Sequence, residues 1–227
     1  MKSNDVAVPV PGYLERVYWW AYVRPAAVRL FERQWLVNLI LWGNFGRLRD
    51  AALDALGARL DGRTLQIACV YGDLTDRLRR RLTPGGSLDV VDVLPVQLDN
   101  LARKLPGDPR VGLIQGDSSA LDVASQSYDR ALLFFLLHEQ PEAVRRRTLA
   151  EALRILKPGG RLVIVDYHRP SRRHPLYWPM AAILRTLEPF ALDLWRHELA
   201  RWLPRGAAIE KATSFGGLYQ RLTVTKS

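Results

Sequence analysis

Two acidic residues follow predicted β-strands at a spacing that suits the binding of a nucleoside. Residues 87–92 predict a strand that ends at Asp92, roughly twenty residues after a loop at 68–75, where a carboxylate can accept hydrogen bonds from both hydroxyls of a ribose. The next predicted strand, 111–114, runs into Asp117, which is placed to meet an adenine amino group. Either acid alone could equally cap a helix or face solvent. Their joint spacing favours a nucleoside cofactor.

The loop that precedes Asp92 lacks most of the glycines that nucleotide-binding turns use. Ala68 and Val70 occupy two of the three glycine positions of such a turn, Gly72 occupies the third, and Gln66 replaces an acid. Glycine lets the backbone approach a ligand closely and adopt positive φ, which Val70 cannot do comfortably. We therefore expect the amino-acid end of a bound cofactor to lie differently at this turn.

The elements that follow predict an α/β fold. Residues 128–137 are almost continuously apolar, as in a strand covered on both faces, and we expect them to form the central strand of a sheet. Helical spacing at 144–156 ends at residues 157–160 (Lys-Pro-Gly-Gly), before a fifth strand at 161–166. In this order the elements resemble the core of class I methyltransferases that depend on S-adenosylmethionine (SAM). The resemblance implies a Rossmann-like sheet with helices on both faces. It also implies that the cofactor contacts Ala68, Val70, Tyr71, Gly72, Asp73, Asp92, Val93, Asp117 and Ser118.

Length and composition indicate a single domain of 227 residues. We expect four segments, namely an N-terminal helical cap at 1–60, a cofactor-binding core at 61–166, a helical flank at 167–205 and closing strands at 206–227. The only cysteine, Cys69, excludes an internal disulfide; it is most simply a small core residue, with a catalytic thiol as the alternative. The first residues lack a signal-peptide pattern, and no apolar run approaches the roughly twenty residues that cross a bilayer.

The net charge of +10 and the pI near 10.2 favour an anionic partner. All seven tryptophans lie outside residues 63–166, in the two flanks. In the second flank, residues 167–204, arginines alternate with aromatic and aliphatic side chains, which suits a lipid headgroup interface. The first flank predicts one aromatic face from residues at helical spacing, namely Phe31, Trp35, Leu39 and Trp42.

Two interpretations of these flanks stay open at the level of sequence. They could associate with a membrane surface, or they could form a helical cap with their aromatic side chains packed over the pocket, and both can hold together. No nucleic-acid-binding motif accompanies the charge, and the aromatic residues follow a helical stripe, so we expect no nucleic-acid partner.

Five segments together carry a closer resemblance. They are residues 18–22 (YWWAY), 41–44 (LWGN), 70–75 (VYGDLT), 134–139 (FFLLHE) and 166–170 (DYHRP). With these residues most of the chain resembles the bacterial RquA family of rhodoquinone-biosynthesis enzymes. The resemblance implies conversion of ubiquinone to rhodoquinone, in which an amino group replaces a ring methoxy group, SAM donates the amino group and a manganese ion assists. It also implies a polyprenyl quinone substrate and a cytoplasmic protein held at the inner face of the bacterial cell membrane.

Replacement of methoxide by an amine on a quinone ring requires a polarised quinone carbonyl, which a divalent cation can provide as a Lewis acid. Manganese prefers carboxylate and imidazole ligands, and polar clusters follow the fourth and fifth predicted strands at the edge where such sheets bind ligands. With the resemblance, these clusters predict the metal ligands His138, Glu139, Asp166 and His168. Without it, adjacent His and Glu are more typical of a helix cap or a satisfied polar pair.

Three side chains are candidates for catalysis: Tyr71, His138 and Tyr167. Tyr71 could orient the α-amine of SAM or hydrogen-bond a quinone oxygen, or it could only pack under the flank. Tyr167 is a candidate general acid.

Two further functions stay open beside amination. The first is an ordinary SAM-dependent methyltransferase that acts on a quinone or lipid precursor. The second is a non-catalytic membrane-associated module with a vestigial SAM pocket.

Overall fold

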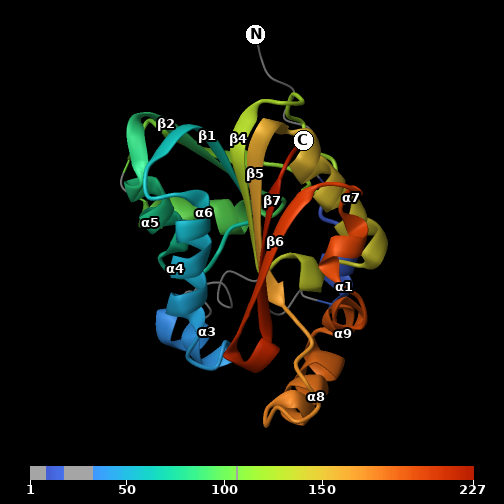
Figure 1. Ribbon diagram of the computed structural model, residues 1–227. Coiled ribbons are helices and arrows are strands. Elements are labelled where there is room, and N and C mark those ends of the chain that lie inside the picture. The colour runs from blue at the N-terminus through green and yellow to red at the C-terminus, as the bar shows by residue number, and fades with distance from the viewer. Residues whose placement is uncertain (1–8, 18–32, 106) are drawn as a thin grey trace.

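A mixed seven-stranded sheet organises the chain, in the order β3-β2-β1-β4-β5-β7-β6 (Figure 1). Strands β1 to β5 are parallel, while β7 runs antiparallel to both β5 and β6. This computed structural model describes residues 9–17, 33–105 and 107–227. The motif at 18–22, with Trp19 and Trp20, and the predicted face residue Phe31 lie outside the described residues.

The strands are β1 (Leu60–Ile67), β2 (Leu82–Asp92), β3 (Val111–Gln115), β4 (Tyr128–Phe134), β5 (Leu156–Tyr167), β6 (Ala208–Ser214) and β7 (Tyr219–Thr225). The α-helices are α1 (Gly12–Val17), α3 (Gln34–Ile40), α4 (Phe45–Leu56), α5 (Leu74–Arg80), α6 (Pro95–Lys104), α7 (Glu142–Arg154), α8 (Tyr177–Leu187) and α9 (Pro189–Arg196). Short 3₁₀ turns are η2 (Leu137–Glu139), η3 (Leu199–Trp202) and η4 (Phe215–Gly217).

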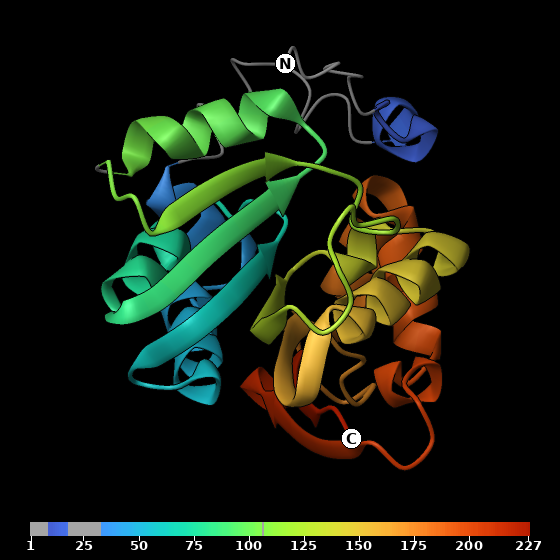
Figure 2. The ribbon, with the colours of Figure 1, turned by 90° about the horizontal axis from the view of Figure 1, so that it is seen from above.

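β4 is the central strand of the sheet, as predicted. Its apolar run fits this position, because both of its faces are covered. Alternate residues serve two separate cores: Leu132 and Phe134 pack toward α4, α5, α6 and α8, while Ala131 and Leu133 pack toward α7, α9 and η3. Figure 2 shows α4, α5 and α6 on one side of the twisted sheet and α7 and α9 on the other. The fold is the α/β Rossmann-like architecture typical of class I methyltransferases.

Helix α7 ends earlier than its sequence pattern predicts. The helix stops at Arg154, and β5 already begins at Leu156, so the Lys-Pro-Gly-Gly segment belongs to the irregular start of a strand. Gly159 in this segment has φ +75°, a conformation that glycine adopts without steric cost.

The two flanks meet at the end of the molecule where α3 and α8 lie (Figure 1). The indole Nε1 of Trp42, just after α3, donates a hydrogen bond of 3.0 Å to the sulfur of Met180 on α8. The described parts of both flanks therefore cap the carboxyl ends of the parallel strands. None of the described helices has the length and apolar character to cross a membrane.

Candidate functional site

A cavity of about 730 Å³ opens at the carboxyl ends of the parallel strands. Its walls come from the residues that follow β1, β2, β3 and β4, and from α1, α3 and α8 above them. This is the edge at which open α/β sheets bind ligands, because the strands diverge there on either side of the point where the chain order reverses. In the order β2-β1-β4, that point lies between β1 and β4.

Seven of the nine predicted cofactor contacts line this cavity. They are Ala68, Val70, Tyr71, Asp92, Val93, Asp117 and Ser118. Gly72 and Asp73 do not line it. Both oxygens of the Asp73 carboxylate accept hydrogen bonds from Arg49, at 2.7 and 2.9 Å, and one accepts a further bond from Arg77, so this acid is held by the neighbouring helices. Asp73 therefore has a structural role instead of the predicted contact with the cofactor.

The loop after β1 keeps a glycine-type backbone although its sequence has drifted. Ala68 has φ +75° and Gly72 has φ +83°, both in the left-handed region. A Cβ at Gly72 would lie 2.9 Å from the ring of Phe45, so this glycine is required by packing. Ala68 thus adopts a strained conformation that favours glycine, and the loop keeps its backbone path at this position. Of the three glycine positions of the pattern, only the one at Val70 places a large side chain in the cavity wall.

Gln66, in the place of an acid, stabilises this strained loop from within the protein. It is fully buried; its amide Nε2 donates to the carbonyl of Ala68 at 3.0 Å, and its Oε1 accepts from the hydroxyl of Thr75 at 3.0 Å. Tyr71 lines the cavity, and its hydroxyl accepts a hydrogen bond of 2.8 Å from Gln97 on α6. Tyr71 thus leans toward the Asp92 side of the cavity.

Asp92 and Asp117 both face the cavity and are both fixed by backbone donors. Asp92 accepts from the N–H groups of Cys69 at 2.7 Å and Leu94 at 2.9 Å, and Asp117 accepts from Ser119 at 2.7 Å. Burial raises the pKa of Asp92, and these backbone hydrogen bonds partly oppose that rise. The two carboxylates are rigid acceptors, as the binding of ribose and adenine requires.

Tyr13 on α1 is a site residue that the sequence reasoning missed. It lines the cavity, and its pKa is raised above its usual range by burial and by the carboxylates of Glu139 and Asp117, which places its hydroxyl among these acids. Its ring packs edge-on against Phe190 at 6.2 Å. A lone tyrosine in an aromatic flank gives no sequence signal for this position.

His138 and Asp166 form a buried pair between β4 and β5. The Nδ1 of His138 lies 2.9 Å from Asp166 Oδ1, and the two carboxylate oxygens also accept N–H bonds from Leu137, His138 and Tyr167. Burial alone would lower the pKa of His138, but Asp166, with help from Glu188 and Glu139, raises it to about 9. His138 is therefore a cation at neutral pH and lines the cavity.

The predicted four-residue metal set is not assembled. His168 follows β5; its Nδ1 lies 2.7 Å from the carbonyl of Gly217, and its Nε2 faces Lys211 and Glu198 instead of the cavity. Asp166 is fully buried, and its oxygens are occupied by the contacts above. In the described part of the chain no group of three or more His, Cys, Asp or Glu side chains could hold a metal ion. The predicted manganese ligand set is therefore wrong, because these four donors are not arranged around one ion.

Tyr167 lies beside His138 in an aromatic cluster. Its ring centroid is 4.8 Å from that of His138 and 5.2 Å from that of Phe135, and it stacks on Tyr219 at 5.8 Å. Burial raises the pKa of Tyr167 well above 10, so its hydroxyl stays protonated and can donate a hydrogen bond but is a poor source of protons. Tyr167 lines the cavity and fits a positioning role better than that of a general acid.

Three acids of the cavity lie at or after the ends of strands β2, β3 and β4, and a fourth, Glu188, follows α8 in a wall that is otherwise mostly apolar. The charged side chains that line the cavity are Asp92, Asp117, Glu139, Glu188 and His138, and no lysine or arginine of the described residues does so. Toward the flanks the wall becomes apolar. Five of its side chains there are large, hydrophobic and also exposed to solvent, namely Leu39, Ile40, Trp42, Ile183 and Leu187. These five residues, here called the apolar mouth, show that the cavity opens through a hydrophobic rim.

Comparison with known proteins gives a consistent result. Residues 64–160 match the family described as "Methyltransferase domain". The ubiquinone/menaquinone biosynthesis C-methyltransferase UbiE of Pseudomonas paraeruginosa is 32% identical over 145 residues, which are 60% of this chain and 54% of that protein. The demethylmenaquinone methyltransferase of Lactobacillus johnsonii is 30% identical over 137 residues, 59% of this chain and 55% of that protein. The chain thus spans about half the length of the curated relatives it matches.

Solved structures share the fold at lower identity. A SAM-dependent methyltransferase from Aquifex aeolicus has a TM-score of 0.60 at 16% identity, over 90% of this chain and 99% of that one. Human N-acetylserotonin methyltransferase in complex with SAM has a TM-score of 0.66 at 16% identity, over 96% of this chain and 60% of that one.

Proposed function

We propose that this chain, whose residues 64–160 form a class I SAM-dependent methyltransferase domain distantly related to the UbiE quinone C-methyltransferases, transfers a methyl group from SAM to a ring carbon of a quinone precursor. The observation that carries the proposal is the cavity itself. It joins acids at the ends of the strands, the imidazolium of His138 and a mouth of exposed hydrophobic side chains. A cationic cofactor, a polar aromatic ring and an apolar tail would fit these three parts in turn.

The residues present fit SAM. Asp92 and Asp117 would accept hydrogen bonds from the ribose and the adenine, and the cluster of carboxylates favours a cation. SAM supplies an activated methyl group on a positively charged sulfur. Ala68, in its left-handed conformation, keeps the backbone open beside this end of the cavity.

His138 would act on an oxygen of the acceptor ring. Its Nδ1 is held by Asp166, which leaves Nε2 as the hydrogen-bond donor on the cavity side, 3.8 Å from Glu139 Oε1. When the ring is a hydroquinone, its hydroxyl proton passes to the Glu139 carboxylate, and the His138 cation stabilises the resulting oxyanion. SAM would supply the methyl group to the ring carbon and leave as S-adenosylhomocysteine. The proton on that carbon would pass to water as the ring becomes aromatic again, and Glu139 would return the hydroxyl proton to the ring oxygen.

The apolar mouth points to a substrate with a hydrocarbon tail. A polyprenyl quinone or its precursor partitions into lipid, and exposed hydrophobic rims of this kind are typical of sites that meet a membrane. We therefore propose peripheral association with the bacterial cell membrane, on its cytoplasmic face, in agreement with the net charge of +10.

Amination of ubiquinone is the second candidate, and Val70 and Tyr71 favour it. Both side chains line the cavity at the cofactor loop, where they narrow the space that the amino-acid end of SAM would occupy. The glycine-type backbone at Ala68 and the unassembled metal set favour methyl transfer, as do the quinone C-methyltransferase relatives. Amination needs the same acceptor pocket, so only the transferred group separates the two reactions.

The deciding experiment follows labelled SAM. We expect the purified protein to transfer the methyl label to a demethylated hydroquinone, with release of S-adenosylhomocysteine. Transfer of the α-nitrogen label to ubiquinone would instead establish amination. Asp92→Asn should weaken SAM binding by roughly tenfold in calorimetry, because a charged acceptor is lost, whereas the exposed control Asp54→Asn should not. If SAM does not bind at all, the non-catalytic alternative replaces both reactions.

A further inference from the structure

A second hollow lies between α8 and α9, and two arginines border it. Its volume is about 450 Å³, and its lining residues are Arg185, Pro189, Leu192, Asp193 and Arg196. Both arginines are exposed, and within the described part of the chain neither guanidinium has a hydrogen bond or ion pair to another residue. Six of the seven arginines in the described helices α5 and α7 are paired with acids, whereas these two flank arginines are not.

The one acid in the hollow does not cancel this charge. Asp193 Oδ2 accepts a hydrogen bond of 3.2 Å from Nη1 of Arg145, which is fully buried behind α9. The negative charge of Asp193 is therefore balanced from the protein interior. Arg185 and Arg196 remain as two uncompensated cations around a space large enough for a tetrahedral anion.

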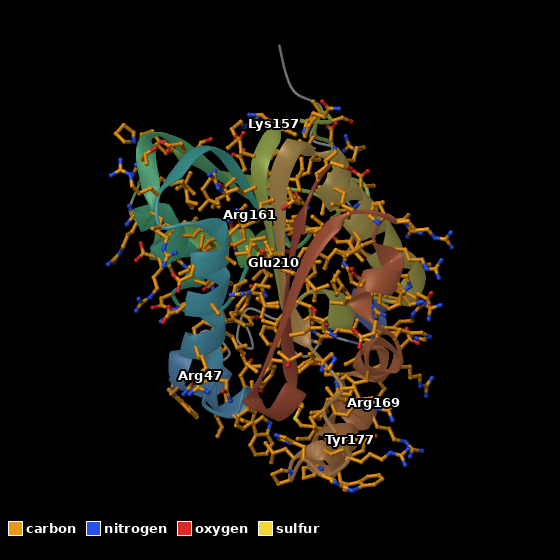
Figure 3. The ribbon with its side chains drawn as sticks, in the orientation of Figure 1. Arg47, Lys157, Arg161, Arg169, Tyr177 and Glu210 are labelled. Carbon is orange, nitrogen blue, oxygen red and sulfur yellow. The ribbon has the colours of Figure 1, made fainter. Side chains whose placement is uncertain are left out.

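The hollow borders the exposed face of α8 that carries Trp178. Trp178, which is 67% exposed, lies seven residues before Arg185 and thus on the same face of α8. Ile183 and Leu187 of the apolar mouth are each two residues from Arg185 on the same helix, and so lie on its other side. Figure 3 shows Arg169 and Tyr177 beside α8, which is the outermost helix at this end of the molecule, and Arg47 near α3 at the same end. An indole and a guanidinium on one exposed face match the boundary between lipid headgroups and acyl chains.

We propose that Arg185 and Arg196 form a binding site for the phosphate of an anionic phospholipid headgroup. The site rests on the proposed membrane association and goes beyond it by naming the contact. With α8 lying on a bilayer, Trp178 meets the acyl boundary, while the guanidinium of Arg185 on the same face and that of Arg196 together bind one lipid phosphate.

The test compares two double variants with the same change in net charge. Arg185→Gln with Arg196→Gln removes the site. Arg59→Gln with Arg205→Gln is the control: both residues are exposed and precede β1 and β6, at the end of the sheet where Lys157 and Arg161 lie in Figure 3. Binding to phosphatidylcholine vesicles with and without phosphatidylglycerol is measured by co-sedimentation. We expect the site variant to lose about tenfold or more of its affinity for the anionic vesicles and the control less than about threefold, since roughly 1 kcal/mol per basic residue is at stake near an anionic surface.

Each of the remaining outcomes would overturn a different part of the proposal. Equal losses in the two double variants would mean that only net charge matters, and the site would be wrong. Arginine-dependent binding of inorganic phosphate in calorimetry, without loss of vesicle binding, would identify a site for a free anion and also overturn the proposal. If the wild-type protein ignores anionic vesicles, membrane association itself fails. Methyl transfer to a tail-free hydroquinone in solution should be equal in all three proteins, so the reaction is judged independently.

Discussion

At the scale of single residues, Asp166 determines the charge of the proposed catalytic group. Three backbone N–H groups hold its carboxylate beside the His138 ring, so the carboxylate cannot turn away, and the imidazole gains a proton in a place where burial alone would remove it. The same contacts remove Asp166 from any metal sphere. One buried acid thus explains both the cation in the cavity and the failure of the predicted ligand set.

The raised pKa of His138 predicts that stability depends on pH. Its pKa is 6.5 in the unfolded chain and about 9 in the folded protein, so the protonated form stabilises the fold fully below pH 6.5, and this contribution is lost as the pH rises through 9. At most about 3 kcal/mol is involved, from 1.36 kcal/mol per pH unit. Urea unfolding across this range should show the fall in the wild type and its absence in His138→Gln. Parallel curves for the two proteins would contradict the imidazolium.

Sequence patterns located the strand-end acids but could not orient side chains beyond them. Asp92 and Asp117 were predictable because strand, turn and acid recur at a fixed spacing. The prediction placed His168 in the cavity, but its ring contacts the carbonyl of Gly217. That residue lies just before β7, forty-nine residues later in the chain, so the contact could not be predicted. The positive φ of Ala68 could not be predicted, because alanine is disfavoured there and adopts it only where buried contacts such as that of Gln66 hold the loop.

At the scale of elements, Arg145 joins the turn η2 to the flank helix α9. Its Nε donates to the carbonyl of Leu137 and its Nη2 to those of Gln140 and Phe190, at 2.9 to 3.0 Å, and the guanidinium lies over the ring of Trp202. The turn that carries His138 is therefore clamped on both sides by one buried side chain. Sequence gives no sign of this, because an arginine on a polar helix normally predicts an exposed position.

Arg145→Lys should loosen this clamp. Lysine is a point donor that cannot serve four acceptors in the planar arrangement of a guanidinium, and buried carbonyls would lose their partners. We expect a loss of about 2–4 kcal/mol in the free energy of unfolding by urea titration, with a fall in kcat for methyl transfer as His138 moves. The matched control is Arg146→Lys, whose exposed pair with Glu142 should cost less than about 1 kcal/mol. Equal effects would mean that Arg145 has no positioning role.

The sheet order and the helical nature of both flanks follow from elements that sequence can identify. The apolar run of β4, the strands at 87–92 and 161–166 and the helix before β5 are all local patterns. What the flanks cover depends on contacts across the chain, such as Trp42 with Met180, 138 residues apart. Hence the choice between cap and membrane surface could not be made from the pattern. In the structure the α8 flank supplies buried cavity wall with Met180 and Leu184 and exposed surface with Trp178.

At the scale of the whole molecule, charge and hydrophobicity are separated. The chain carries +10 overall, yet acids and one histidine are the charged groups of its cavity among the described residues. The positive surface favours an anionic bilayer, while the acidic interior favours a cationic cofactor. Between the two lies the apolar mouth, which neither charge pattern explains and which a hydrocarbon tail would occupy.

Activity should therefore increase with the length of the substrate's tail. Each methylene buried in the apolar mouth contributes about 0.8 kcal/mol, so even partial burial of one added isoprene unit should raise kcat/KM for methyl transfer by about tenfold until the mouth is filled. Detergent-free assays with short-tailed hydroquinones below their aggregation limit measure this without a membrane. Ile183→Ser should reduce the gain from the tail while leaving kcat/KM for the tail-free ring unchanged, because Ile183 lies in the mouth and not beside His138. A kcat/KM that does not respond to tail length would show that the mouth serves no substrate, and the exposed hydrophobic rim would then have to be explained by membrane contact alone.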